Sequence, residues 1–201
     1  MPQFKYITVD ILDEVLPYIQ KQLNKTKKVK LSDKEIDYLK HEILNRCPSC
    51  FLKLLNLNKS FEAFRIIVEY NGDIGKAFYP QLIIEKKRAV GYYLINKFLA
   101  EDLVPKISKK EVAEDKFFER LLTGICKLLG VSVFGRIEAA EHMVNRMKRY
   151  KKVVEIRKGE LSVEHGKYNG NPYSSGSHVT WFPYVEINEW DIFSEVVKNY
   201  Y

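Results

Sequence analysis

The stretch YPQLIIEKKRAVGYYL, residues Tyr79 to Leu94, decides between two architectures for this chain. If it is a strand, Glu85 and Lys87 lie on one face, because side chains two residues apart on a strand point the same way. Together with Asp73, twelve residues upstream of Glu85, they would supply the carboxylates and the lysine of a metal-dependent nuclease. If it is a helix, the same charges form a solvated band without chemistry of its own.

The apolar residues of this stretch favour the helix. They recur at intervals of seven, four and four, as Ile83, Val90, Leu94 and Phe98, and this is the spacing of one helix face. Pro80 suits the first turn, where a missing amide donor costs nothing. We therefore predict a helix with Glu85 in its charged band. The alternative is a PD-(D/E)xK-type nuclease that uses Asp73, Glu85 and Lys87.

Most of the remaining chain also carries helical signals. Two capping boxes, Ser32–Glu35 and Ser108–Glu111, each place a serine before a helix and a glutamate three residues later. The segment SFEAFRIIVEY, residues 60–70, is also predicted to be helical. It begins with a serine and is followed by Asn71 and Gly72, which are typical of a helix C-terminus. Helices are thus predicted at residues 9–22, 33–46, 61–70, 80–98, 109–129 and 135–150.

The pattern changes after Lys151. Residues 152–157 and 160–165 are typical of a hairpin that turns at Lys158 and Gly159, and residues 166–177 are too polar for the core. Residues 178–187 are aromatic and β-rich, and Asn188 then caps a last helix. The predicted fold class is α+β and predominantly α-helical. Residues 1–150 form a helical body, and residues 151–201 form a small antiparallel β segment plus a C-terminal helix packed on that body.

The three cysteines do not predict a metal site. Cys47 and Cys50 form the motif CPSC, Cys126 stands apart, and only His41 is near the pair, whereas structural zinc takes about four ligands. The abundance of lysine, glutamate, isoleucine and tyrosine leans towards a hyperthermophilic, archaeal source, in which an intracellular disulfide would be compatible with the sequence. Otherwise these are ordinary helix-end and core cysteines.

Positive charge is concentrated before residue 160. The chain has a net charge of +7, and its first 159 residues hold 31 basic and 20 acidic side chains. Such a surface favours a polyanionic partner, usually DNA or RNA. The densest basic segment is NRMKRYKKVVEIRK, in which Tyr150 could stack on a base. The predicted nucleic-acid-binding residues are Arg146, Lys148, Arg149, Tyr150, Lys151, Lys152, Arg157 and Lys158. A lysine-rich helix exit that complements the helix dipole is the alternative.

Several other functional classes lack their sequence signals. The chain has no Walker A, G-x-G-x-x-G, G-x-S-x-G or HExxH motif, so we assign no catalytic residue, metal ligand or cofactor. It has no apolar run of about 18 residues, and its first residues lack the apolar core of a signal peptide. We expect a cytoplasmic protein with no membrane partner.

Two segments carry a family resemblance. Glu85-Lys86-Lys87-Arg88-Ala89, which follows the apolar segment FRIIVEY, is similar to an E-x-K-R-A motif on the second of two central helices. The C-terminal segment PYVEINEWDIFSEVVKNYY resembles a strand followed by a helix with an apolar-Ser-apolar core, although Pro183 stands where glycine or alanine is usual. Together they resemble the N-terminal domain of the large subunit of archaeal and eukaryotic DNA primase.

The resemblance implies a non-catalytic subunit in DNA replication. Such a subunit binds the catalytic primase subunit, or another replication protein, and helps to engage single-stranded DNA or a template–primer. The family's iron–sulfur domain lies further along the chain and needs four cysteines, so the resemblance implies no cofactor in these 201 residues. An interaction protein with no nucleic-acid role is a third functional class that the sequence leaves open.

Overall fold

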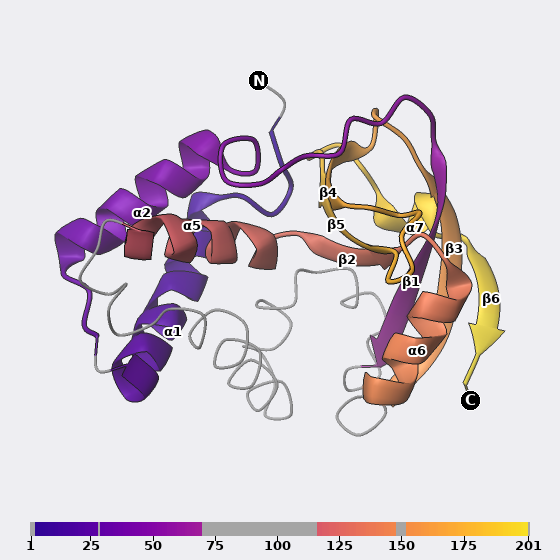
Figure 1. Ribbon diagram of the computed structural model, residues 1–201, viewed down its shortest axis with the longest axis horizontal. Helices are drawn as coiled ribbons and strands as arrows, with labels where there is room; N and C mark the ends of the chain where they lie inside the picture. The colour runs from indigo at the N-terminus through magenta and orange to yellow at the C-terminus, as the bar shows by residue number, and fades with distance from the viewer. Residues whose placement is uncertain (1–2, 28, 70–115, 148–151, 201) are drawn as a thin grey trace. The chain divides into compact units, whose positions relative to one another are not determined.

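The computed structural model describes residues 3–27, 29–69, 116–147 and 152–200. Figure 1 labels their helices and strands. The chain divides into two compact units. The helical unit comprises Ile7–Leu52 and Gln81–Leu129, and the sheet unit comprises Met1–Tyr6, Lys53–Pro80 and Gly130–Tyr201.

Several sequence predictions lie outside the described residues. They include the stretch Tyr79–Leu94, the capping box Ser108–Glu111, and Asp73 of the alternative nuclease site. The choice between helix and strand at Glu85 therefore stays a prediction.

The helical unit contains the helices α1 (Val9–Lys27), α2 (Asp33–Arg46) and α5 (Lys116–Leu128). All three lie where helical spacing predicted them, and α1 extends five residues beyond the predicted end at residue 22. One face of α1 is buried, through Leu12, Val15, Leu16, Ile19 and Leu23. Pro17 lies within α1 on its exposed side. The first capping box is confirmed: the Ser32 amide donates to Glu35 Oε2 at 2.7 Å, and the Glu35 amide donates to Ser32 Oγ at 3.4 Å.

The helical unit is also held by a disulfide. Cys47, the residue that follows α2, is bonded to Cys126 in the last turn of α5, and the two Cα atoms are 5.9 Å apart. Elsewhere along the same two helices, the ring of Tyr38 on α2 packs edge-on against Phe118 on α5, with the ring centroids 5.9 Å apart. Cys50 is free and exposed. Cys47 and Cys50 therefore do not pair with each other in this structure.

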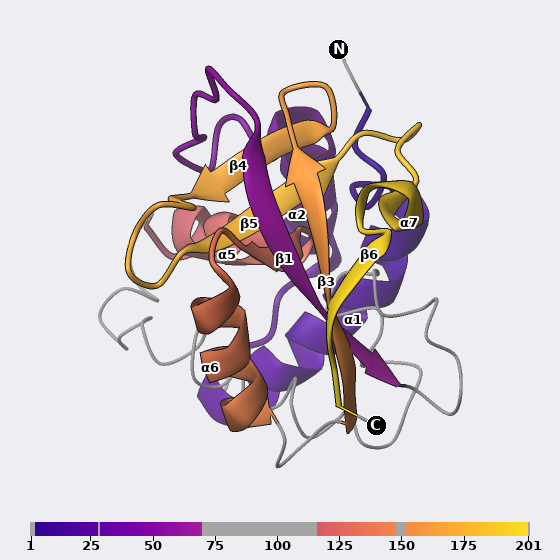
Figure 2. The ribbon, with the colours of Figure 1, turned by 90° about the vertical axis from the view of Figure 1, so that its right-hand side faces the viewer.

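The sheet unit is built on a six-stranded antiparallel sheet, counted over the described residues, with the strand order β4-β5-β2-β1-β3-β6. Figure 2 shows β1 and β3 side by side, with β6 next to β3. The strands are β1 (Phe61–Glu69), β2 (Val131–Phe134), β3 (Lys152–Leu161), β4 (Gly166–Gly170), β5 (His178–Pro183) and β6 (Glu195–Asn199). The prediction of a predominantly helical protein is therefore wrong, because the sheet is a substantial part of the fold.

One helix crosses over the centre of this sheet. β2 and β3 each pair antiparallel with β1, so they run parallel to one another on either side of it. The connection between them is α6 (Ile137–Met147), which contacts all three of these strands. Its buried residues Ala140 and Val144 have no exposed surface. The C-terminal end of α6 and the first residue of β3 therefore both belong to the sheet unit.

The helix predicted at residues 61–70 is the central strand β1. Its buried residues are Phe61 and all of residues 63 to 67, because both faces of this strand are covered. Full burial removes the polar–apolar alternation that identifies a strand, and a short apolar run of this kind cannot be distinguished from a buried helix by periodicity. A misassigned central strand is the main reason that the sheet was not expected.

Three further predictions near the C-terminus need correction. The predicted hairpin turn at Lys158 and Gly159 lies inside β3, which continues to Leu161. The polar segment 166–177 contains β4, and Tyr168 on this strand is 1% exposed. The last helix is α7 (Glu189–Ile192), only four residues long, and the chain then forms β6.

The predicted cap on that last helix is nevertheless confirmed. The Asn188 side chain accepts a hydrogen bond from the amide of Trp190. The chain beyond α7 becomes a strand because it pairs with β3, an interaction that local spacing does not reveal. Val196 and Val197 are β-branched residues, which suit a strand better than a helix.

Candidate nucleic-acid interface

The predicted basic segment lies at the connection between α6 and β3. Arg146 is exposed in the last turn of α6, and Lys152 is the first residue of β3. Between them, Lys148, Arg149, Tyr150 and Lys151 lie outside the described residues. The structure therefore defines the two ends of this segment but not the side chains at its middle.

Two acidic side chains of α6 have basic partners of their own. Glu138 Oε2 lies 3.6 Å from Arg136 Nε, and Glu141 accepts a hydrogen bond from Lys198 on β6. The contact with Glu141 also raises the pKa of Lys198. Because both carboxylates of α6 lie close to other cations, they do little to offset the positive charge at its C-terminal end.

Arg157, another predicted contact, has intramolecular partners. Its Nε donates to Glu155 Oε1, and its Nη1 donates to the carbonyl oxygen of Phe193 at 3.3 Å. The guanidinium also lies over the ring of Trp190, 4.8 Å from its centroid. These contacts connect β3 to α7 and the residue after it. A structural role accounts for Arg157 better than phosphate binding does.

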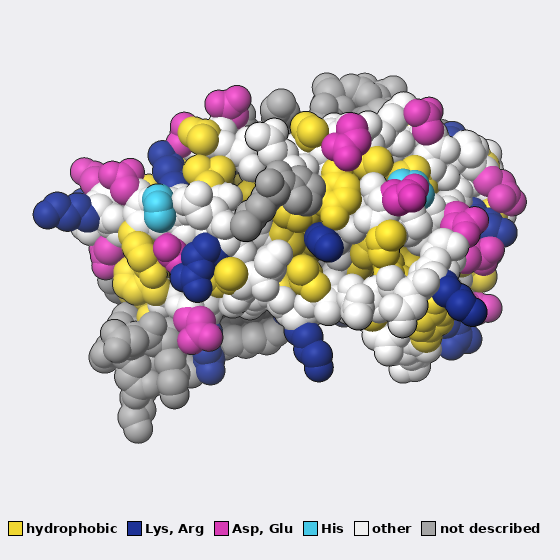
Figure 3. All heavy atoms as spheres, turned by 90° about the horizontal axis from the view of Figure 1, so that it is seen from above, with side chains coloured by type: hydrophobic (Ala, Val, Ile, Leu, Met, Phe, Trp, Pro, Cys, Tyr) yellow, Lys and Arg dark blue, Asp and Glu magenta, His cyan; other side chains and the backbone are white. Residues whose placement is uncertain are grey.

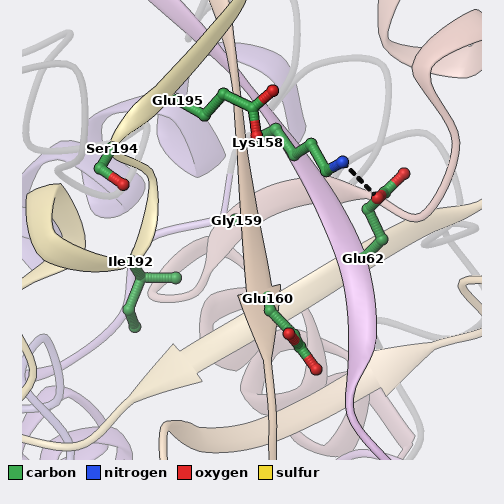
Figure 4. Close-up of a pocket in the computed structure, with 7 residues that line it drawn as sticks. All are labelled: Glu62, Lys158, Gly159, Glu160, Ile192, Ser194 and Glu195. Carbon is green, nitrogen blue, oxygen red and sulfur yellow. Dashed lines mark ion pairs between the residues drawn. The ribbon is translucent and has the colours of Figure 1, made fainter.

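Lys158 is held by an ion pair across the sheet. Its Nζ lies 2.7 Å from Glu62 Oε2 on β1, and this contact, with a smaller effect from Glu195, raises the pKa of Lys158. Figure 4 shows the Lys158 side chain directed at Glu62, with Glu195 nearby. In the strand register, Lys158 pairs with Phe64 on β1 and with Glu195 on β6.

An acidic pocket surrounds this lysine. It has a volume of about 430 Å³ and is lined by Glu62, Lys158, Gly159, Glu160, Ile192, Ser194 and Glu195. Its lining thus holds three carboxylates and one ammonium, and Glu160 accepts a hydrogen bond from Ser60 Oγ. A phosphate at this position would be repelled. The sequence does not predict this pocket, because Glu62 was expected on a helix, whereas the strand register pairs Glu62 with Glu160.

The predicted nucleic-acid-binding residues therefore separate into two groups. Arg157 and Lys158 are used within the sheet unit, whereas residues 146 to 152 contain five basic residues and no acidic residue. On the face in Figure 3, basic and acidic side chains of the described residues are interspersed and do not gather into one basic patch. The predicted contacts without described intramolecular partners therefore lie in this short basic segment.

No family model, curated protein or solved structure matches this chain. Among the described residues, no three His, Cys, Asp or Glu side chains are grouped so as to hold a metal ion. In the same part of the chain, no helix combines the length and the apolar character that crossing a membrane requires. The alternative nuclease residues Asp73, Glu85 and Lys87 lie outside the described residues.

Proposed function

We propose that this protein is a non-catalytic nucleic-acid-binding subunit that contacts the phosphate backbone through the segment Arg146–Lys152. The observation that carries the proposal is the density of charge in this segment, RMKRYKK, with five basic residues, one tyrosine and no acid. Lysine and arginine contacts to phosphates release condensed counterions, which provides affinity without sequence preference. Tyr150 supplies an aromatic ring on which a base can stack.

The position of the segment supports this role. It joins the end of α6 to the start of β3, two elements packed in the same unit, so its ends are anchored. The two carboxylates of α6, Glu138 and Glu141, already contact Arg136 and Lys198. Cations at a helix C-terminus also complement the helix dipole, worth about 0.3–1 kcal/mol each. Complementing the helix dipole does not require five basic residues, so it does not by itself explain the charge of this segment.

The salt dependence of binding tests the proposal. Five phosphate contacts to single-stranded DNA predict a slope of about −3.5 for log K against log salt concentration. The double variant Arg146→Gln, Lys152→Gln should reduce that slope by about 1.4. Fluorescence anisotropy with a labelled oligothymidylate, at several salt concentrations, measures both quantities.

A matched control removes the same charge elsewhere. Lys53 and Lys167 are exposed residues of the sheet unit outside the basic segment, and the double variant Lys53→Gln, Lys167→Gln should keep the wild-type slope. If both double variants change the slope equally, binding follows net charge and not this segment. Tyr150→Ala should weaken binding by about 1–3 kcal/mol with little change in slope, because stacking is not electrostatic.

The primase partner is a separate part of the proposal. It depends on the sequence resemblance at Glu85–Ala89, outside the described residues, and at the C-terminal segment, which here forms the end of β5, α7 and β6. The sheet differs from the mainly helical body that the sequence pattern predicted. Size-exclusion chromatography with an archaeal catalytic primase subunit tests this partner. Separate elution at micromolar concentrations would remove it while leaving nucleic-acid binding to its own assay.

A further inference from the structure

The helical unit contains a buried disulfide with an exposed thiol close to it in sequence. Cys47 and Cys126, which form the disulfide, are 7% and 0% exposed, whereas Cys50 is exposed and free. A dissolved thiol has little access to either bonded sulfur. Cys50 is the remaining one of the chain's three cysteines, and it lies three residues from Cys47 in the sequence.

The backbone between Cys47 and Cys50 forms a tight turn. The amide of Cys50 donates to the carbonyl oxygen of Arg46 at 2.9 Å, and the amide of Leu52 donates to that of Pro48 at 3.0 Å. The hydrogen bond from Cys50 to Arg46 holds Cys50 beside the peptide group that joins Arg46 to Cys47, although Cys47 itself is in an extended conformation (φ −77°, ψ 141°). A disulfide between Cys47 and Cys50 needs Cα atoms about 4.4–6.8 Å apart, so the exchange requires this turn to bring the two residues within that range.

A cation accompanies the free thiol. Hydrogen bonds from Arg46 to Glu42 and to Cys50 raise the pKa of Arg46, in that order of importance. Arg46 Nη1 lies 2.5 Å from Glu42 Oε2, and its guanidinium also lies 5.5 Å from the centroid of the Phe51 ring. Arg46 is therefore a neighbour of the free thiol at the end of α2.

We propose that Cys50 is a thiol–disulfide exchange site that opens the buried bond from within. The Cys50 thiol loses its proton to solvent and its sulfur attacks Sγ of Cys47. A Cys50–Cys47 bond forms as the Cys47–Cys126 bond breaks, and Cys126 leaves as a thiolate that takes up a proton. No net oxidation or reduction occurs, because one disulfide and one thiol are exchanged for another disulfide and another thiol.

The exchange moves the disulfide to an exposed position. In the new arrangement one of its sulfurs belongs to Cys50, which a small external thiol such as glutathione can attack. That attack forms a mixed disulfide with glutathione on Cys50 and releases the Cys47 thiol. A second glutathione then attacks the mixed disulfide, which restores the Cys50 thiol and releases oxidised glutathione. The covalent link between α2 and α5 thereby becomes responsive to low-molecular-weight thiols, although the bond itself is buried.

The rate of reduction by glutathione tests the proposal. The folded wild-type protein, Cys50→Ser and the control Ser49→Ala are incubated with excess glutathione, quenched in acid, alkylated and mapped by mass spectrometry. Ser49 is exposed and lies in the same turn, but it carries no thiol. We expect Cys50→Ser to lose the Cys47–Cys126 bond at least about 10-fold more slowly than the wild type, and Ser49→Ala to match the wild type.

A second variant tests the proposed product directly. In Cys126→Ser, oxidised glutathione should produce the internal Cys47–Cys50 disulfide, seen as a mass loss of two hydrogens with no glutathione adduct. Equal reduction rates for Cys50→Ser and the wild type would overturn the proposal. Stable glutathione adducts on Cys126→Ser in place of the internal bond would overturn it as well. Circular dichroism of each variant before the reaction confirms that the proteins compared are folded.

Discussion

Reduction of the Cys47–Cys126 disulfide should cause a large loss of stability. The bond closes a loop with a sequence separation of 79 residues. In the chain-entropy relation, a loop of 79 residues lowers the entropy of the unfolded chain by about 15 cal/mol/K, or about 4.5 kcal/mol at 25 °C. A folded domain is typically stable by only about 5–15 kcal/mol, so a loss of this size should be evident in any unfolding experiment.

Urea unfolding of oxidised and fully reduced wild-type protein, followed by circular dichroism, measures the effect. Reduction retains both sulfur atoms, so this comparison isolates the cross-link from the cavity that substitution of the buried Cys126 would create. The control is Cys50→Ala, which lacks only the exposed free thiol and should unfold like the oxidised wild type. Measured values for disulfides range from about 0 to 5 kcal/mol, because native strain and residual unfolded structure intervene.

A loss below about 1 kcal/mol on reduction would refute the reasoning. It would mean that the unfolded chain already keeps α2 and α5 close together, so that the cross-link removes little conformational freedom. If oxidised Cys50→Ala were destabilised as much as the reduced wild type, the loss of stability would come from the exposed thiol and not from the disulfide.

Two further predictions concern the sheet unit. Gly159→Ala should destabilise the protein by about 1–3 kcal/mol, since the new Cβ would lie 2.6 Å from the carbonyl oxygen of Ile192. Thermal unfolding measures this loss. The control is Gly176→Ala, whose Cβ would meet no atom within 4 Å. Tyr168→Phe should cost about 1 kcal/mol at neutral pH through the lost hydrogen bond to the Ser162 carbonyl oxygen. Burial raises the pKa of Tyr168 above its usual 10.0, so the folded state resists ionisation of this phenol. Stability is fully present below pH 10 and should fall above it, by about 1.4 kcal/mol per pH unit relative to Tyr168→Phe. A constant difference between the two proteins from pH 9 to 11 would contradict this, as would equal stability of the two glycine variants.

Long-range pairing explains why the candidate sites were predicted only in part. The basic segment Arg146–Lys152 is contiguous, so its charge density could be identified directly. The ion pair between Glu62 and Lys158 joins residues 96 positions apart in the sequence. It could not be foreseen once β1 was assigned as a helix. The stacking of Arg157 on Trp190 depends likewise on the return of the chain after β3.

The sequence by itself determined the features whose hydrogen bonds and packing are local. The capping box Ser32–Glu35 and the cap at Asn188 depend on residues within a few positions of one another, and both are confirmed. Only the tertiary structure decided that residues 61–69 form the central strand, and that Cys47 bonds to Cys126 and not to Cys50. The physical reason is that a strand obtains its hydrogen bonds, and a disulfide its partner, from distant parts of the chain. A strand buried on both faces has no periodicity of its own by which to recognise it.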